Sequence, residues 1–341
     1  MPAAVGLPMK HRNVTTARRT VQVVFFALIL YGGFVFPHGY EATLMPGIEA
    51  GTPRTTMYSR DRILWVSGKE SVIDLYLPVL ACRFIAQGGF FKSCSVHVLS
   101  ENFTWKTSLK LLLPHVTWLA ILSFILARSW CGWACPLGAT QDALSWVRRK
   151  LSIAPWHVTD GLRRFIGNLR HVLLWLSLAI SILIALPLLG AQGVNDALFL
   201  VYCQICPGRI AYPLLGGVNP CWTDWSNSIT TFMTFLGWAF LGVFALSFTT
   251  PRLWCRICAV GALLSYFNRG GLLALEKRPG KCTFCGTCRR VCPVDVERVY
   301  KERAPSVVTD TQCTLCLRCL ETCPEKGCLS AKLAGVKLTE S

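Results

Sequence analysis

The residues with the clearest chemistry are cysteines in two runs near the C-terminus. The stretches CTFCGTCRRVCP and CTLCLRCLETCP begin at Cys282 and Cys313, and both have the spacing C-x2-C-x2-C-x3-C-P. In this pattern three close thiolates bind one iron–sulfur cubane, and the fourth cysteine binds the neighbouring cluster. The predicted ligands of the first [4Fe–4S] cluster are Cys282, Cys285, Cys288 and Cys323. The predicted ligands of the second are Cys313, Cys316, Cys319 and Cys292.

Zinc is the alternative metal for closely spaced cysteines. A tetrahedral zinc ion takes four thiolates and does not explain a doubled triplet in which each run ends in Cys-Pro. Cys328 lies outside the pattern, and we interpret it as a small buried residue.

The composition is that of a membrane protein with a polar appendage. Of the 341 residues, 52% are hydrophobic and 16% are charged, whereas a soluble domain carries roughly 25% charged residues. Lys and Arg number 35 against 18 Asp and Glu, but the excess clusters around apolar runs and cysteines. We therefore interpret it as a topology signal and as counter-charge for anionic cofactors, and we expect no nucleic-acid partner.

Four apolar runs are long enough, or nearly so, to cross a bilayer. They lie at 21–37, 109–127, 171–189 and 229–248. Basic residues concentrate between the second and third runs, which predicts that both termini and the 128–170 loop are cytoplasmic. The predicted location is the bacterial cytoplasmic (inner) membrane, with several spans and a cytoplasmic ferredoxin domain.

The predicted fold is mainly α: four transmembrane helices arranged as two parallel helix-pair repeats, followed by a C-terminal α+β, bacterial-type 2[4Fe–4S] ferredoxin domain. The expected parts are a cytoplasmic N-terminal segment (1–20), a membrane domain (21–270), the ferredoxin domain (277–330) and a tail (331–341). Within the membrane domain the repeats cover about 21–139 and 171–262.

The repeat is visible in two cysteine motifs. RSWCGWACPLGA begins at Arg128 and RLWCRICAVGA begins at Arg252, so both contain Arg-x-Trp-Cys and then Cys-x-x-Gly-Ala. The second motif has one residue fewer between its cysteines and lacks the proline. Another cysteine, Cys82 or Cys206, stands 49 positions before the first cysteine of each motif.

Parallel repeats pack about an axis along the membrane normal, which would gather the cysteines into two sets of four. The predicted inner set is Cys131, Cys135, Cys255 and Cys258. The predicted outer set is Cys82, Cys94, Cys206 and Cys221, with Cys203 as a spare or alternative ligand. For the inner set a cluster, a Cu(I) site and structural cysteines are open; for the outer set a cluster and disulfides are open. One or two further [4Fe–4S] clusters are therefore hypotheses.

Other features point away from further cofactors. The sequence has no C-x-x-C-H haem motif, His115 and His171 form no obvious haem pair, and no nucleotide-binding glycine motif occurs. Arg252, Arg256 and Arg269 are interpreted as topology charges, with compensation of cluster charge as a further candidate role. Trp130 and Trp133 are interpreted as anchors at the membrane interface.

With four apolar runs, C-G-W-x-C-P-x-G after the second and a double-cubane C-terminus, the chain resembles the NapH/NosR/CcoG-type membrane polyferredoxins over about residues 15–330. The resemblance implies electron transfer between the quinone pool or cytoplasmic donors and a membrane or periplasmic partner. It implies redox partner subunits in a hetero-oligomeric, quinol-linked oxidoreductase complex, with quinone as a candidate cofactor. The alternatives are a Cu(II) or other metal reductase, and a metal-centre assembly factor that uses the membrane cysteines. No catalytic residue is predicted.

Overall fold

The computed structural model describes residues 12–35, 73–79, 91–92, 94–104, 109–156, 158–185, 198, 200–215, 225 and 228–341. The long apolar helices are α1 (Arg12–Val35), α5 (Leu109–Leu126), α8 (Asp160–Ala185) and α12 (Ser228–Ala245). Three stretches of the described chain are long and apolar enough to cross a membrane, at 14–31, 160–184 and 228–248. The apolar part of α5 is shorter, Leu113–Leu126. The structure is thus mostly helical, with apolar helices near all four predicted runs.

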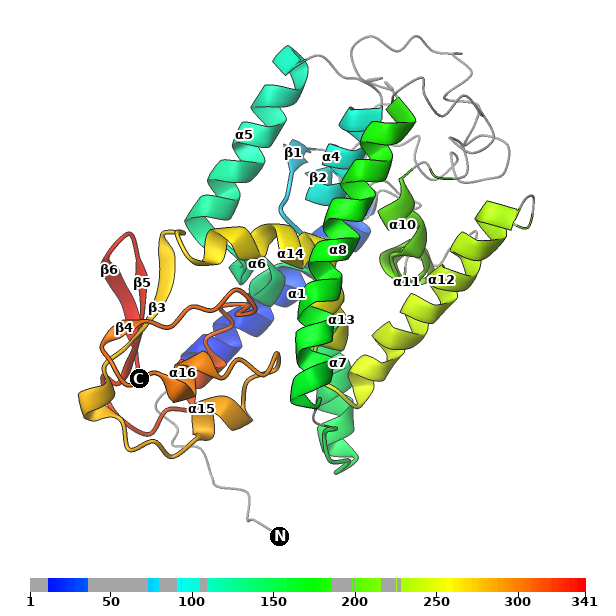
Figure 1. Ribbon diagram of the computed structural model, residues 1–341. Helices are drawn as coiled ribbons and strands as arrows, with labels where there is room; N and C mark the ends of the chain where they lie inside the picture. The colour runs from blue at the N-terminus through cyan, green and yellow to red at the C-terminus, as the bar shows by residue number, and fades with distance from the viewer. Residues whose placement is uncertain are drawn as a thin grey trace.

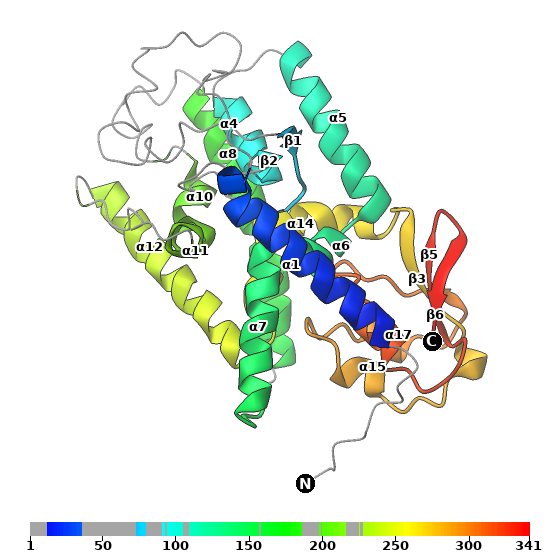
Figure 2. The ribbon, with the colours of Figure 1, turned by 180° about the vertical axis from the view of Figure 1, so that it is seen from behind.

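Two of these helices begin earlier than the sequence predicts. α1 begins at Arg12 and α8 at Asp160, because the helical conformation continues through polar turns in front of each apolar run. The predicted N-terminal segment 1–20 therefore includes the first turns of α1. In Figure 2, α1 crosses the back of the molecule and its polar end reaches α17 (Arg318–Glu321).

Short elements connect the long helices and carry most of the motif residues. They are α4 (Ser95–Thr104), α6 (Ser129–Trp133), α7 (Pro136–Lys150), α10 (Val201–Ile205), α11 (Gly208–Leu215), α13 (Leu253–Ile257) and α14 (Ala259–Ser265), with 3-10 turns η4 (Leu246–Phe248) and η5 (Tyr266–Asn268). Strands β1 (Ile73–Tyr76) and β2 (Phe91–Lys92) pair in parallel. Figure 1 shows α10 and α14 on either side of α8.

The C-terminal module is a small α+β unit. Its elements are β3 (Leu273–Lys277), η6 (Pro279–Lys281), α15 (Thr287–Arg290), α16 (Arg298–Lys301), β4 (Ser306–Val307), α17, β5 (Leu329–Leu333) and β6 (Val336–Glu340). The strands form an antiparallel sheet in the order β4-β3-β5-β6. The sheet starts before the predicted boundary at 277 and includes residues assigned to a tail, because strand residues without cysteines gave no signal.

The ferredoxin module shares a hydrophobic core with the helical part. Ala127 and Trp133, which adjoin the first membrane motif, pack in the same cluster as Leu315, Leu317 and Leu329 of the module. The backbone amide of Leu272 also donates to the carbonyl of Phe124, 2.9 Å away, at the end of α5. The module is therefore held against the ends of the apolar helices and is not a loosely tethered domain.

Candidate metal centres

The structure brings the four predicted inner cysteines together. Cys131, Cys135, Cys255 and Cys258 line one cavity of about 310 Å³, a volume that includes its open mouth. Apolar and small residues complete the lining: Val79, Leu137, Trp254, Val260 and Gly261. All four cysteines are buried. The similarity of the two motifs in the sequence thus corresponds to a spatial grouping of their four cysteines.

The two motifs reach this geometry by the same local structure. Each first cysteine lies in a five-residue helix, α6 or α13. Each second cysteine has an extended ψ, 120° at Cys135 and 127° at Cys258, and forms the N-cap of the next helix. Pro136 occupies the first position of α7, where proline is favoured because its fixed φ suits a helix start. Its replacement by Ala259 leaves the second motif in the equivalent geometry.

The arginines of the two motifs cross over to the opposite repeat. Arg128 donates through Nη2 to the carbonyl of Cys255 at 2.6 Å, and Arg252 donates through Nη2 to the carbonyl of Gly132 at 3.3 Å. Both side chains are almost fully buried, 1% and 0% exposed. Each also reaches the ferredoxin module: Arg128 at the carbonyl of Thr311 (3.1 Å) and Arg252 at the hydroxyl of Thr314 (3.2 Å). These reciprocal contacts lock the two motifs to each other.

The inner cavity fits an anionic group held by thiolates. Burial raises the pKa of the Cys131 thiol to about 12, so a cation is needed to keep this set ionised. The guanidinium of Arg128 faces Gly261 on the cavity wall, and its Nε is buried without a hydrogen-bond partner in the described structure. A [4Fe–4S] cluster with four thiolate ligands carries net negative charge, which matches this buried cation.

The first ferredoxin quartet also lines a single cavity. Cys282, Cys285, Cys288 and Cys323 surround about 360 Å³, again including the open mouth. Cys328 lines the same cavity and interacts with the sulfur atoms of Cys282 and Cys323. It is 2% exposed, in agreement with a small buried residue, but it lies beside predicted ligands.

The second ferredoxin quartet is grouped in the same way. The thiol of Cys319 interacts electrostatically with Cys313, Cys316 and Cys292, which are its predicted co-ligands. It also interacts with Cys288 of the first quartet, so the two quartets are neighbours. The fourth cysteine of each run therefore lies with the triplet of the other, as the spacing requires for crossed ligation.

The two cysteine loops of the module have matching backbones. Phe284 and Leu315 stand two residues after the first cysteine of each run and have φ of 53° and 46°. Their amides donate to the sulfur atoms of Cys282 and Cys313 at 3.4 Å. Gly286 and Leu317, four residues after the first cysteine, are left-handed as well. These turns point backbone amides at the sulfur atoms, which stabilises thiolates.

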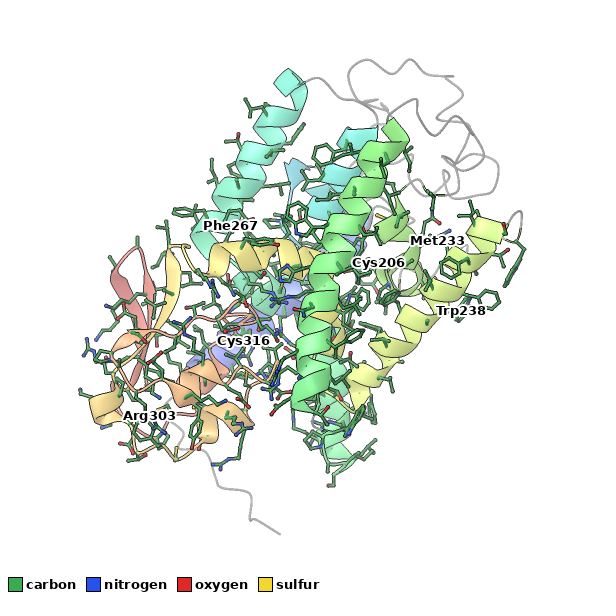
Figure 3. All side chains as sticks on the ribbon, viewed as in Figure 1. Cys206, Met233, Trp238, Phe267, Arg303 and Cys316 are labelled. Carbon is green, nitrogen blue, oxygen red and sulfur yellow. The ribbon has the colours of Figure 1, made fainter. Side chains whose placement is uncertain are left out.

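Side chains from the helical part hold the second cysteine loop. Trp133 donates its indole N–H to the carbonyl of Leu315 at 3.0 Å, and Arg18 donates to that of Cys316 at 2.6 Å. Asn268 donates to the carbonyl of Cys313 at 2.7 Å. A Cβ at Gly132 would collide with the carbonyl of Thr314. In Figure 3, Cys316 lies where the module meets the helical part. The loop of the second ferredoxin quartet therefore lies directly on the loop between Cys131 and Cys135.

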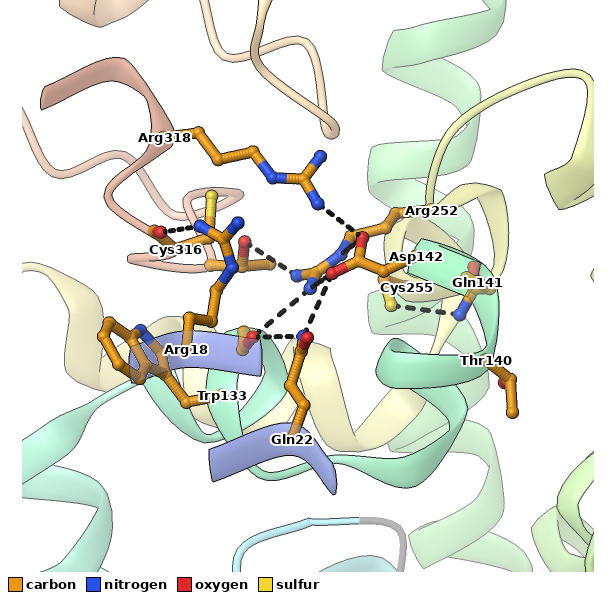
Figure 4. A network of polar contacts seen from close by, with 12 residues as sticks. Arg18, Gln22, Trp133, Thr140, Gln141, Asp142, Arg252, Cys255, Cys316 and Arg318 are labelled. Atoms are coloured by element: carbon orange, nitrogen blue, oxygen red, sulfur yellow. Dashed lines mark hydrogen bonds and ion pairs between the residues drawn. The ribbon is translucent and has the colours of Figure 1, made fainter. Parts of the chain in front are cut away.

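A buried ion network reinforces the contact between the ferredoxin module and the helical part (Figure 4). Asp142 of α7 pairs with Arg252 at 2.7 Å and with Arg318 of the ferredoxin module at 3.0 Å. Gln22 of α1 donates to the same carboxylate at 3.0 Å. Burial raises the pKa of Asp142, but the two guanidinium groups outweigh it and hold that pKa well below its usual range. One carboxylate thus links three segments that are far apart in the sequence.

These contacts show partners that the sequence does not indicate. Arg252 and Arg256 are buried: Arg256 is 3% exposed and pairs with Asp295 of the ferredoxin module at 2.6 Å. Trp130 and Trp133, predicted at the membrane interface, both donate hydrogen bonds within the molecule. Trp130 donates to the carbonyl of Leu122 at 3.1 Å, while Trp133 binds the ferredoxin loop. The motif residues serve packing within the molecule, which a single motif cannot reveal.

The predicted outer set is only partly described. Cys82 and Cys221 lie outside the described residues, whereas Cys94 and Cys206 are buried. The hydroxyl of Tyr202 lies 3.2 Å from the sulfur of Cys258 and also interacts electrostatically with Cys206 and Cys94. The sequence predicts that these two cysteines lie at the face opposite the inner set. In the structure, Cys94, Cys206 and Cys258 all interact with the same tyrosine, and Cys206 lies among the helices in Figure 3.

Cys203, the predicted spare ligand, has a partner that the sequence does not indicate. Its sulfur lies 3.3 Å from Nδ1 of His97. In the part of the chain that the structure describes, no three His, Cys, Asp or Glu side chains are close enough to share one metal ion.

The comparisons with known proteins match both groups of motifs. A family model described as a 4Fe-4S binding domain matches residues 113–154 and 230–282, which contain the two membrane motifs. A second model, a 4Fe-4S dicluster domain, matches residues 274–324. These matches support iron–sulfur clusters as the cofactors. No solved structure matches the chain.

Several relatives agree with the family models. An uncharacterized protein of Methanocaldococcus jannaschii is 28% identical over 70% of this chain and 85% of its own length. The regulatory protein NosR of Pseudomonas aeruginosa is 27% identical over 67% of this chain but only 28% of its own length. The ferredoxin-type protein NapH of Escherichia coli is 28% identical over 58% of this chain and 60% of its own length.

The names of these relatives and the two domain models support the NapH/NosR-type polyferredoxin family for this chain. The family names and domains support an iron–sulfur electron-transfer role, as the sequence predicts. Because the match covers 28% of NosR and 60% of NapH, the activities of those whole proteins do not carry over with it.

Proposed function

We propose that this protein carries electrons between the ferredoxin clusters and a third [4Fe–4S] cluster bound by Cys131, Cys135, Cys255 and Cys258. The contact of the Cys313–Cys316 loop with Gly132 is the observation that carries this proposal. It joins the backbone of one predicted ligand loop to the backbone of another without an intervening layer of side chains. An electron leaving the second ferredoxin cluster has this contact as its direct route into the helical part.

A bound cluster supplies a one-electron couple whose potential is set by ligation, hydrogen bonds and burial. The chain's own residues hold the four thiolates in place, exclude water and supply positive charge. Arg128 and Arg252 provide two buried cations beside the cavity, of which only Arg252 has a carboxylate partner among the described ion pairs. The uncompensated positive charge of Arg128 favours an anionic group in the cavity.

The wider setting follows from the apolar helices and the family. We propose a multi-pass protein of the cytoplasmic membrane with its ferredoxin module on the cytoplasmic side. There it would exchange electrons with the quinone pool or cytoplasmic donors and with a membrane or periplasmic partner in a complex. A further cluster at Cys82, Cys94, Cys206 and Cys221 remains part of this proposal. The burial of Cys94 and Cys206 near Tyr202 supports a second centre close to the first.

Iron and acid-labile sulfide per chain test the proposal. The ferredoxin clusters alone give about eight irons, and each further cubane adds about four. We expect at least about twelve irons in the purified protein and a loss of about four in Cys131→Ala. Ser129→Ala is the matched control, because it shortens another buried side chain of α6 and removes no sulfur atom. Unchanged iron in Cys131→Ala would refute the third cluster.

Electron transfer is tested by reduction of the purified protein with a quinol analogue. Under this proposal, quinol reduces the ferredoxin clusters only through the inner cluster. In Cys131→Ala their EPR signals should therefore be absent with the quinol analogue but present with dithionite. Equal reduction of both proteins by quinol would show that electrons bypass the inner site.

A further inference from the structure

Three buried side chains beside the inner cavity have hydrogen-bond donors directed at, or available to, sulfur. They are Gln141 of α7, Tyr202 of α10 and Trp254 of α13, and they are 0%, 2% and 1% exposed. None belongs to a cysteine pair, and the electron-transfer proposal does not use them. Each of them can donate one hydrogen bond to a sulfur atom of the inner site.

The amide of Gln141 has one possible orientation. Its oxygen accepts the backbone N–H of Trp254 at 3.1 Å and the hydroxyl of Ser247 at 3.0 Å. A backbone N–H can only donate, so the atom that faces it must be the oxygen. The amide nitrogen therefore faces the sulfur of Cys255, 3.2 Å away, and donates to it.

The hydroxyl of Tyr202 is oriented by the same logic. Its oxygen accepts the backbone N–H of Ala259 at 3.2 Å, which leaves its proton free to point at the sulfur of Cys258. A metal-bound cysteine has no proton of its own, so in the loaded protein the tyrosine must be the donor.

The indole of Trp254 lines the cavity itself. Its Nε1 is buried and has no hydrogen-bond partner among the described residues. An unpaired buried N–H costs free energy unless a partner arrives, and a cluster sulfur atom in the cavity would be that partner. The equivalent residue of the first repeat, Trp130, already donates to the carbonyl of Leu122. The donors therefore lie close to Cys255 and Cys258, the cysteines of the second repeat.

We propose that Gln141, Tyr202 and Trp254 raise the reduction potential of the inner cluster by donating hydrogen bonds to its cysteine and inorganic sulfur atoms. The inference rests on the proposed inner cluster. Reduction adds one electron and makes the cluster more negative, so donors stabilise the reduced form more than the oxidised form. The three residues are positioning and tuning residues, and they transfer no electrons themselves.

An EPR-monitored potentiometric titration of the full, cluster-loaded chain tests this inference. The inner cluster is the component that Cys131→Ala lacks. At a fixed potential, Tyr202→Phe and Trp254→Phe should each lower the ratio of reduced to oxidised inner cluster about tenfold, equivalent to about 59 mV for one electron. The reduction potentials of the two ferredoxin clusters should not change.

Two substitutions serve as matched controls. Tyr266→Phe removes a hydroxyl that contacts His171 and Trp175 outside the cavity, and Trp130→Phe removes an indole that is already paired. Neither should shift the inner potential. Unchanged inner potentials in both Tyr202→Phe and Trp254→Phe, or equal shifts in the controls, would overturn the inference.

A second measurement needs no variant. In D2O, the reduced inner cluster of the wild-type chain should lose hyperfine couplings from exchangeable protons close to its sulfur atoms. Absence of such couplings contradicts the donor assignment even if the variants fail to fold. If the wild-type chain lacks the inner component altogether, the proposed function fails with the inference, and the iron content separates that outcome from a failure of tuning alone.

Discussion

Replacing Asp142 by asparagine should detach the ferredoxin module from the helical part. The substitution keeps the shape and the acceptor oxygen but removes the charge that pairs with Arg252 and Arg318. Arg252 is fully buried, so it would be left as a buried cation without a counter-ion. Removing one partner of a buried pair costs about 3–5 kcal/mol. Because Arg318 is 19% exposed and water compensates it in part, we expect about 3 kcal/mol, roughly a hundredfold in the docking equilibrium.

Hydrogen exchange at the amides of α17 and of the Cys313–Cys316 loop measures this opening. Glu297→Gln is the matched control, because Glu297 also has three basic partners, Arg163, Arg289 and Lys301. Two of these partners are more than half exposed, so this cluster should contribute less than about 1 kcal/mol. If Asp142→Asn exchanges no faster than Glu297→Gln, the assignment of the buried network as the main electrostatic link is wrong.

Three further predictions concern the contact between the ferredoxin module and the helical part. Gly132→Ala should cost about 1–3 kcal/mol by overpacking against Thr314 and should slow electron transfer into the inner cluster in freeze-quench EPR, whereas Gly161→Ala, with open space around it, should not. Arg252→Lys keeps the charge but loses the forked donor geometry, and should weaken docking by about 2 kcal/mol in the exchange assay. The depressed pKa of Asp142 stabilises docking above the unfolded pKa of about 3.9, so protection should be constant from pH 8 to 5 and decline only below about pH 4 as the carboxylate protonates.

The grouping of the ligands could be predicted because it follows from the spacing of the cysteines along the chain. The two C-x2-C-x2-C-x3-C-P runs and the equal offsets from Cys82 to Cys131 and from Cys206 to Cys255 are regularities along the chain. The structure groups the ferredoxin quartets and the inner set as these spacings indicate. The positions of the long helices could be predicted as well, because each contains a continuous run of apolar residues.

The surroundings of the ligands could not be predicted in this way. Asp142 and Arg318 are 176 positions apart, and neither belongs to a periodic pattern. Gln141 and Tyr202 resemble many other polar residues near apolar runs until their partners are known. A tryptophan beside an apolar run indicates an interface residue. The hydrogen bond of Trp133 depends on a carbonyl of the ferredoxin loop, which is far away in the sequence.

The crossed arginines bear on how the protein is made. Arg128 needs the carbonyl of Cys255 and that of Thr311, which lies 183 residues further along the chain. At about 5–20 residues per second, Thr311 leaves the ribosome roughly ten to forty seconds after Arg128. Cys131 and Cys135 lack the opposite motif until Cys255 and Cys258 are made, and they lack the module that covers them for the whole of that interval. Cluster insertion at this site must therefore follow completion of nearly the whole chain, and a truncated product would lack the pocket that captures iron.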